Sequence, residues 1–114
     1  MNLDSIKAKP NSRFLVCDDE RHVVRLIHLN LERHGYRVTC AYGGRDALDL
    51  LKRKFFDGAV IDLLMPDIDG AEVVANIRSR EDSMTTKIVL MTSRDESIDE
   101  WARANVDADW FFGK

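Results

Sequence analysis

The stretch from Gly58 to Gly70 constrains the fold of this chain more than any other. It begins with a wholly apolar run, continues with the acid Asp62, and ends in a turn that contains Pro66 and Gly70. A short apolar run bounded by turn residues is typical of a strand that is buried on both faces. We therefore expect Asp62 at the carboxyl end of a buried strand, which is where open parallel α/β sheets bind their ligands.

Three further apolar strands are each followed by polar side chains in the same way. The acids Asp18 and Asp19 follow one strand, the hydroxyl of Thr92 follows another, and the amine of Lys114 follows the last. In a parallel sheet the carboxyl ends of the strands lie at one edge. The pattern thus predicts three carboxylates, a hydroxyl and a lysine at one place, which suits phosphoryl transfer.

The alternation of apolar strands with helical periodicity predicts βαβ units with right-handed crossovers and a parallel sheet. Strands are expected over 14–17, 36–41, 58–61, 87–91 and 108–112, and helices over 20–34, after 43–44, after 70, and over 97–105. Residues 1–12 show no periodicity and are expected to form an N-terminal tail, which leaves 13–114 as one domain.

Length and charge exclude several classes of protein. A chain of 114 residues supports a single core, and its net charge of -3 disfavours binding to nucleic acid. No apolar run approaches the roughly 20 residues that span a bilayer, and the N-terminus lacks the apolar core of a signal peptide. We expect a cytoplasmic protein that contacts no membrane, in which Cys17 and Cys40 stay reduced.

Together these motifs resemble the receiver domain of two-component response regulators, including the chemotaxis regulators. The resemblance runs from about Arg13 to the last residue. It is carried by Asp18-Asp19, by Asp62 in Asp-Leu-Leu-Met-Pro-Asp-Ile-Asp-Gly, by Thr92-Ser93, and by Phe111-Phe112-Gly-Lys114. It implies a flavodoxin-like open parallel five-stranded sheet with strand order 2-1-3-4-5.

The resemblance also gives the site residues their expected roles. Asp62 is the phosphoacceptor, because a carboxylate oxygen can attack phosphorus and hold the group as an acyl phosphate. Mg²⁺ would neutralise the charge that this reaction brings together. Thr92 and Lys114 would bind phosphoryl oxygens, and Phe111 matches the switch aromatic. The expected metal ligands are Asp19 directly, Asp18 largely through water, Asp62, and the backbone carbonyl of Leu64.

We therefore expect a phosphoacceptor receiver domain that a histidine kinase or phosphotransfer protein phosphorylates on Asp62 in a Mg²⁺-dependent reaction. It would signal to a downstream effector protein or output domain as a self-modifying switch and not as a turnover enzyme. The alternative is a non-phosphorylated protein-interaction module on the same fold, which would have no use for the full set of polar side chains. A metal-dependent phosphatase is the second rival, but the sequence shows no general acid or substrate pocket for it.

Other polar residues are given less specific roles. The three histidines of the first helix are six residues apart, so they form no metal pair and are expected to be surface or packing residues. Glu20 and Asp69 are expected to cap helices. Leu64 and Arg94 are expected to flank the approach of water to the phosphoryl group, and because neither is a good base, the acyl phosphate should be long-lived.

Family members continue from the lysine into a fifth helix, and this helix is missing from the chain. Its absence leaves Trp110 and Phe112 on one uncovered face of the last strand. We expect either that the chain is a fragment of a longer regulator, or that residues 1–12 or a second subunit cover this face. Self-association as a homodimer through the side of the first helix would follow from an uncovered face.

Overall fold

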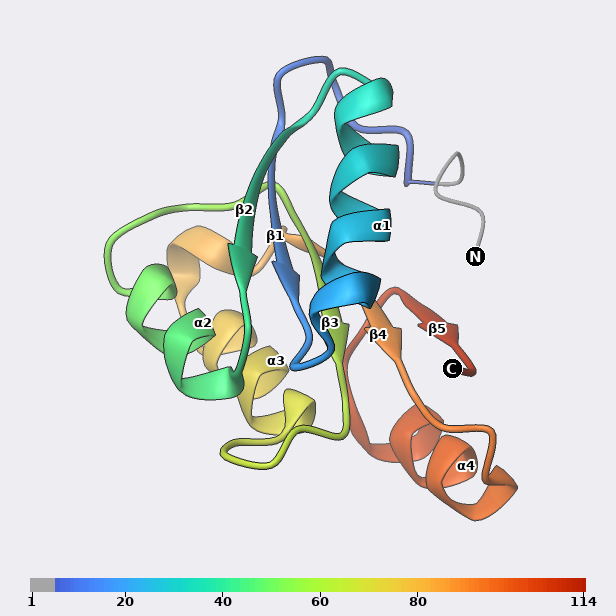
Figure 1. The fold of residues 1–114 in the computed structure, drawn as a ribbon. Coiled ribbons are helices and arrows are strands. Elements are labelled where there is room, and N and C mark those ends of the chain that lie inside the picture. The colour runs from blue at the N-terminus through green and yellow to red at the C-terminus, as the bar shows by residue number, and fades with distance from the viewer. Residues whose placement is uncertain (1–5) are drawn as a thin grey trace.

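Five parallel strands form one sheet in the order β2-β1-β3-β4-β5, in a computed structural model that describes residues 6–114 (Figure 1). The order agrees with the one expected. All four strand pairs are parallel, and Asp62 lies opposite Met91, the residue that precedes Thr92. The strands are β1 (Arg13–Cys17), β2 (Arg37–Ala41), β3 (Gly58–Asp62), β4 (Lys87–Met91) and β5 (Trp110–Phe112).

Helices connect the strands and cover both faces of the sheet. α1 lies in front of the sheet in Figure 1, while α2 and α3 lie behind it. The expected first helix and the observed one agree to within a residue at each end, whereas β5 begins two residues later than expected. The helices are α1 (Arg21–Arg33), α2 (Gly44–Leu51), α3 (Gly70–Arg78), α4 (Glu96–Asn105) and the short 3-10 helix η2 (Glu81–Ser83) in the loop before β4.

The first core cluster lies between the sheet and α2, α3 and α4. Every residue of β3 is buried, as expected for a strand that is covered on both faces. The apolar residues of α3 recur at helical spacing and turn toward the sheet. The helical residues of this cluster are Ala47, Leu51, Val73, Val74, Ile77 and Ala102.

The second core cluster lies under α1, and it includes part of the N-terminal segment. Val24, Ile27 and Leu31 of α1 pack over β1, β3 and β4. Ile6 belongs to the same cluster and is only 6% exposed. The hydroxyl of Tyr36 bonds to the backbone of Ala8, which ties the segment to the start of β2. Residues 6–12 of the expected tail therefore contact the domain, and residues 1–5 lie outside the described part of the chain.

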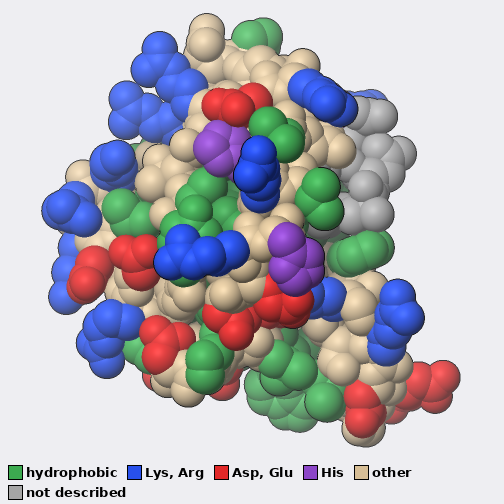
Figure 2. Space-filling model, viewed as in Figure 1, with side chains coloured by type: hydrophobic (Ala, Val, Ile, Leu, Met, Phe, Trp, Pro, Cys, Tyr) green, Lys and Arg blue, Asp and Glu red, His purple; other side chains and the backbone are tan. Residues whose placement is uncertain are grey.

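The edge of the sheet beside α1 carries an apolar groove. Trp110 and Phe112 turn toward the α1 side, as the alternation predicted, while Phe111 turns toward α4. A groove of about 320 Å³ runs between α1 and β5, and Leu26, which is 67% exposed, lies on its rim. Figure 2 shows hydrophobic side chains exposed among charged ones on the face that carries α1.

Within residues 6–114, no helix is long and apolar enough to cross a bilayer.

Candidate functional site

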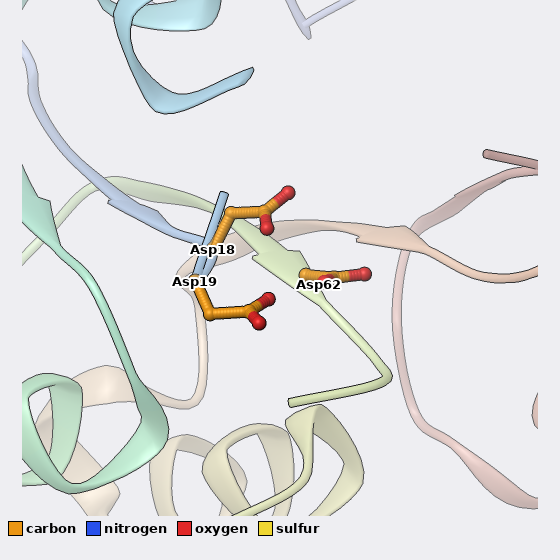
Figure 3. Close-up of side chains that lie close together, drawn as sticks. All are labelled: Asp18, Asp19 and Asp62. Carbon is orange, nitrogen blue, oxygen red and sulfur yellow. The ribbon is translucent and has the colours of Figure 1, made fainter. Parts of the chain in front are cut away.

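The carboxylates of Asp18, Asp19 and Asp62 meet at the carboxyl edge of the sheet. One oxygen from each lies within 4.8 Å of the others, and Figure 3 shows them projecting from the end of β3 and from the loop after β1. Asp18 and Asp62 are buried, whereas Asp19 is exposed. The expected proximity of the three acids is thus confirmed. Asp62 Oδ1 is buried and has no hydrogen-bond partner among the described residues.

Lys114 brings a positive charge into this group of acids. Its Nζ donates to Asp18 Oδ2 at 2.8 Å and to Asp62 Oδ2 at 3.3 Å, and it lies 2.9 Å from Glu20 Oε1. Burial disfavours the ammonium, but the hydrogen bonds to Asp18 and Glu20 outweigh burial and raise the pKa of Lys114 above its usual value. The ammonium therefore stays charged and partly neutralises the acids.

The environment of Asp62 opposes its ionisation. Burial and then the neighbouring Asp18 carboxylate raise the pKa of Asp62 above its ordinary value, while the Lys114 ammonium offsets part of this rise. A second cation close to the acids would stabilise the ionised form of all three carboxyl groups. The buried, unpartnered oxygen of Asp62 and the two further carboxylates fit Mg²⁺, which takes oxygen ligands and keeps several waters in its shell.

The turn after β3 folds back tightly on the strand end. The N–H of Gly70 donates to the Leu63 carbonyl at 2.8 Å, and a Cβ on Gly70 would overlap the Asp62 carbonyl oxygen. Glycine is therefore required at this close approach. Asp69 caps α3 by accepting the N–H of Glu72 at 2.9 Å, as the sequence predicted.

A pocket of about 280 Å³ opens beside the acids. Leu64 is half exposed on its wall, which agrees with the expectation that it flanks the approach to Asp62. Arg94, which was expected to flank the same approach, lines the apolar groove beside α1 instead. The pocket is lined by Glu20, Asp62, Leu64, Thr92, Ser93 and Lys114.

Thr92 lines this pocket, but its hydroxyl is engaged elsewhere. Thr92 is only 2% exposed, and its Oγ1 donates to Asp99 Oδ1 of α4 at 2.6 Å. Its backbone N–H donates to the Phe112 carbonyl at 2.7 Å, which fixes the end of β4 against β5. Phe111 is half buried against the α4 side of the sheet.

Three acids have partners that the sequence did not predict. Glu20 was expected to cap α1, and this is wrong for its side chain, which makes no capping bond and lies against Lys114 and His22. Asp67 accepts the N–H groups of Gly44 and Arg45 at the start of α2. Asp99, the third, lies on α4, and only the fold brings it to Thr92.

The chain belongs to the response regulator receiver domain family, whose family model matches residues 14–114. The fold and the arrangement of acids, hydroxyl and lysine at the edge of the sheet are in accord with this membership.

Solved structures of receiver domains are similar to this chain over most of its length. The signal receiver domain of a histidine kinase from Syntrophus aciditrophicus has a TM-score of 0.83 at 25% identity, over 90% of this chain and 78% of that one. A response regulator of Thermotoga maritima, solved in complex with Mg²⁺ and BeF, has a TM-score of 0.76 at 30% identity. The match covers 90% of this chain and 86% of that one. A chemotaxis response regulator of Vibrio cholerae has a TM-score of 0.79 at 27% identity, and the match covers 90% of this chain and 86% of that one.

Proposed function

We propose that this domain accepts a phosphoryl group on Asp62 from a phosphohistidine and acts as a conformational switch in two-component signalling. The observation that carries the proposal is the buried, unpartnered Oδ1 of Asp62, which lies among two further acids and a lysine. The similar regulator of Thermotoga maritima was solved with Mg²⁺ and a fluoride of beryllium, which supports the same chemistry here.

The step is a substitution at phosphorus. An oxygen of ionised Asp62 forms the new O–P bond, the P–N bond to the donor histidine breaks, and the departing imidazole nitrogen keeps the electron pair and gains a proton. Asp18, Asp19, Asp62 and the Leu64 carbonyl would hold Mg²⁺, which when bound neutralises charge on the phosphoryl oxygens. Lys114 supplies a fixed positive charge to one phosphoryl oxygen.

The domain on this proposal modifies itself and releases its phosphate slowly, so it is a switch and not a turnover enzyme. Its donor would be a histidine kinase or a phosphotransfer protein, and its target an effector protein or output domain. Leu64 supports slow release, because its side chain stands in the pocket wall and offers no base to an attacking water.

Mass spectrometry tests this function directly. The purified protein, incubated with acetyl phosphate and Mg²⁺, should gain the mass of one phosphoryl group, and omission of Mg²⁺ should prevent the gain. Asp62→Asn should abolish it, whereas Asp49→Asn, which alters an exposed acid of α2, should leave it unchanged. Normal phosphorylation of the Asp62→Asn variant would overturn the assignment.

A further inference from the structure

The Thr92 hydroxyl already has an anionic partner before any phosphoryl group arrives. It donates to the Asp99 carboxylate at 2.6 Å, a short distance that is typical of a hydrogen bond to a charged oxygen. A hydroxyl carries a single proton, so it can serve one such acceptor at a time. An acyl phosphate on Asp62 would present a second anionic acceptor for that same proton.

Asp99 is itself held in place on α4. Its Oδ2 accepts from Arg103 Nε at 2.8 Å, one turn further along the helix. The Arg103 guanidinium lies over the ring of Phe111, at 5.3 Å from the ring centroid, within the range of a cation–π contact. The contacts therefore run from Thr92 through Asp99 and Arg103 to Phe111.

The bond from Thr92 is the shorter and the more buried of the two that hold the Asp99 carboxylate, at 2.6 Å against 2.8 Å for the bond from Arg103. Arg103 is half exposed, and exposed ion pairs one helical turn apart contribute little to the stability of the fold. Thr92 is buried, so its hydroxyl must find a partner inside the protein. Thr92 first and then Arg103 lower the pKa of Asp99, which keeps this carboxylate ionised at neutral pH.

We propose that Asp99 is a positioning residue that holds the Thr92 hydroxyl on α4, so that the phosphoryl group must compete with Asp99 for it. This inference rests on the proposed function, because it concerns the same acceptor site. A hydrogen bond to a charged acceptor shifts an equilibrium by about tenfold or more. Loss of the Asp99 acceptor should therefore favour the phosphorylated form by about that factor.

The affinity for beryllium fluoride in the presence of Mg²⁺ measures this competition without hydrolysis. We expect Asp99→Ala to bind it about tenfold more tightly than the wild type, and Asp99→Asn, which keeps a weaker neutral acceptor, to lie between them. Glu100→Ala is the matched control, because it removes the neighbouring exposed charge of α4 and should leave the affinity unchanged. Circular dichroism establishes that each variant is folded.

A double-mutant cycle with Thr92→Val separates positioning from a general effect of charge or of α4 packing. Valine keeps the shape of threonine but has no hydroxyl, so Asp99→Ala should change the affinity by less than about twofold in that background. An equal gain in both backgrounds would overturn the inference, as would wild-type affinity of the Asp99→Ala variant. If the folded wild type binds no beryllium fluoride, the proposed function fails and this inference fails with it.

Discussion

The Nζ of Lys114 lies 2.8 Å from Oδ2 of Asp18, a carboxylate that is fully buried. The contact joins the last residue of the chain to the end of β1, 96 positions earlier. A buried carboxylate that loses its cation is costly, because neither water nor another charge compensates for it. Lys114 thus stabilises the buried acids of the site, in addition to the role proposed for it in binding a phosphoryl oxygen.

We expect Lys114→Met to lower the free energy of unfolding by about 1–3 kcal/mol in the absence of Mg²⁺, since two buried acids lose a charged hydrogen-bond donor. Added Mg²⁺ should restore more stability to this variant than to the wild type, because the ion supplies the missing charge. Urea denaturation with and without Mg²⁺ measures both effects. Lys52→Met, at the exposed end of α2, is the control, and an equal deficit at all Mg²⁺ concentrations would contradict the prediction.

Most of the fold and the central acids could be predicted from the sequence, because each depends on local pattern. An apolar run that ends in an acid places Asp62 at the end of β3, and parallel pairing alone then brings Asp18 and Asp19 beside it. Side-chain alternation likewise predicts that Trp110 and Phe112 lie on one face of β5, as they do. These predictions needed strand order and side-chain alternation but no detail of side-chain contacts.

The contacts that could not be predicted join elements that are far apart in the sequence or compete for one side chain. Glu20 stands where a capping acid is common, yet the proximity of Lys114 decides its partner. Asp99 has the sequence position of an ordinary acid in the first turn of a helix, and only the docking of α4 brings it to Thr92. Ile6 lacks any periodic neighbours, so its burial depended on where the segment runs.

A second prediction concerns pH. The pKa of Asp62 is raised above 3.8, so protonation of its carboxyl stabilises the folded state below about that pH, and this stabilisation is lost as pH rises through the higher folded-state pKa. Without Mg²⁺, the free energy of unfolding should therefore fall as pH rises from the unfolded-state pKa to the folded-state pKa of Asp62. Asp62→Asn should remove this component of the fall. Identical pH profiles for the two proteins in urea denaturation would contradict this prediction.

A third prediction concerns the lifetime of the acyl phosphate. Leu64 is half exposed on the wall of the site pocket, where its side chain offers no hydrogen-bonding group to position a water. Leu64→Asn supplies hydrogen-bonding groups at the same point and should speed dephosphorylation by about tenfold, equivalent to ~1.4 kcal/mol in activation free energy. Release of radiolabelled phosphate from the phosphorylated protein measures the rate. Leu29→Asn, on the exposed surface of α1, should not change it, and an unchanged or slower rate for Leu64→Asn would count against the argument.

A fourth prediction concerns Asp67, which joins the loop after β3 to the start of α2. Hydrogen bonds from the backbone N–H groups of Arg45, Ile68 and Gly44 lower the pKa of Asp67 to about 2. Ionised Asp67 therefore stabilises the folded state above pH 3.8, and this contribution is lost as pH falls through about 2. Asp67→Ala should speed hydrogen exchange at the Gly44 and Arg45 amides, whereas Asp49→Ala should not. Unchanged exchange at those two amides in Asp67→Ala would show that the cap contributes nothing to the order of α2.

The last prediction decides whether the N-terminal segment is a tail or a part of the core. Ile6 is 6% exposed and packs with the side chains under α1, so truncation should leave a cavity. We expect Ile6→Ala to lower the free energy of unfolding by about 2 kcal/mol, near the low end for such substitutions, because the segment can relax around the gap. Leu29→Ala, which removes a 45% exposed side chain from α1, should change it by less than about 0.5 kcal/mol. Equal stability of Ile6→Ala and the wild type in urea denaturation would show that residues 6–12 are a tail and not a part of the core.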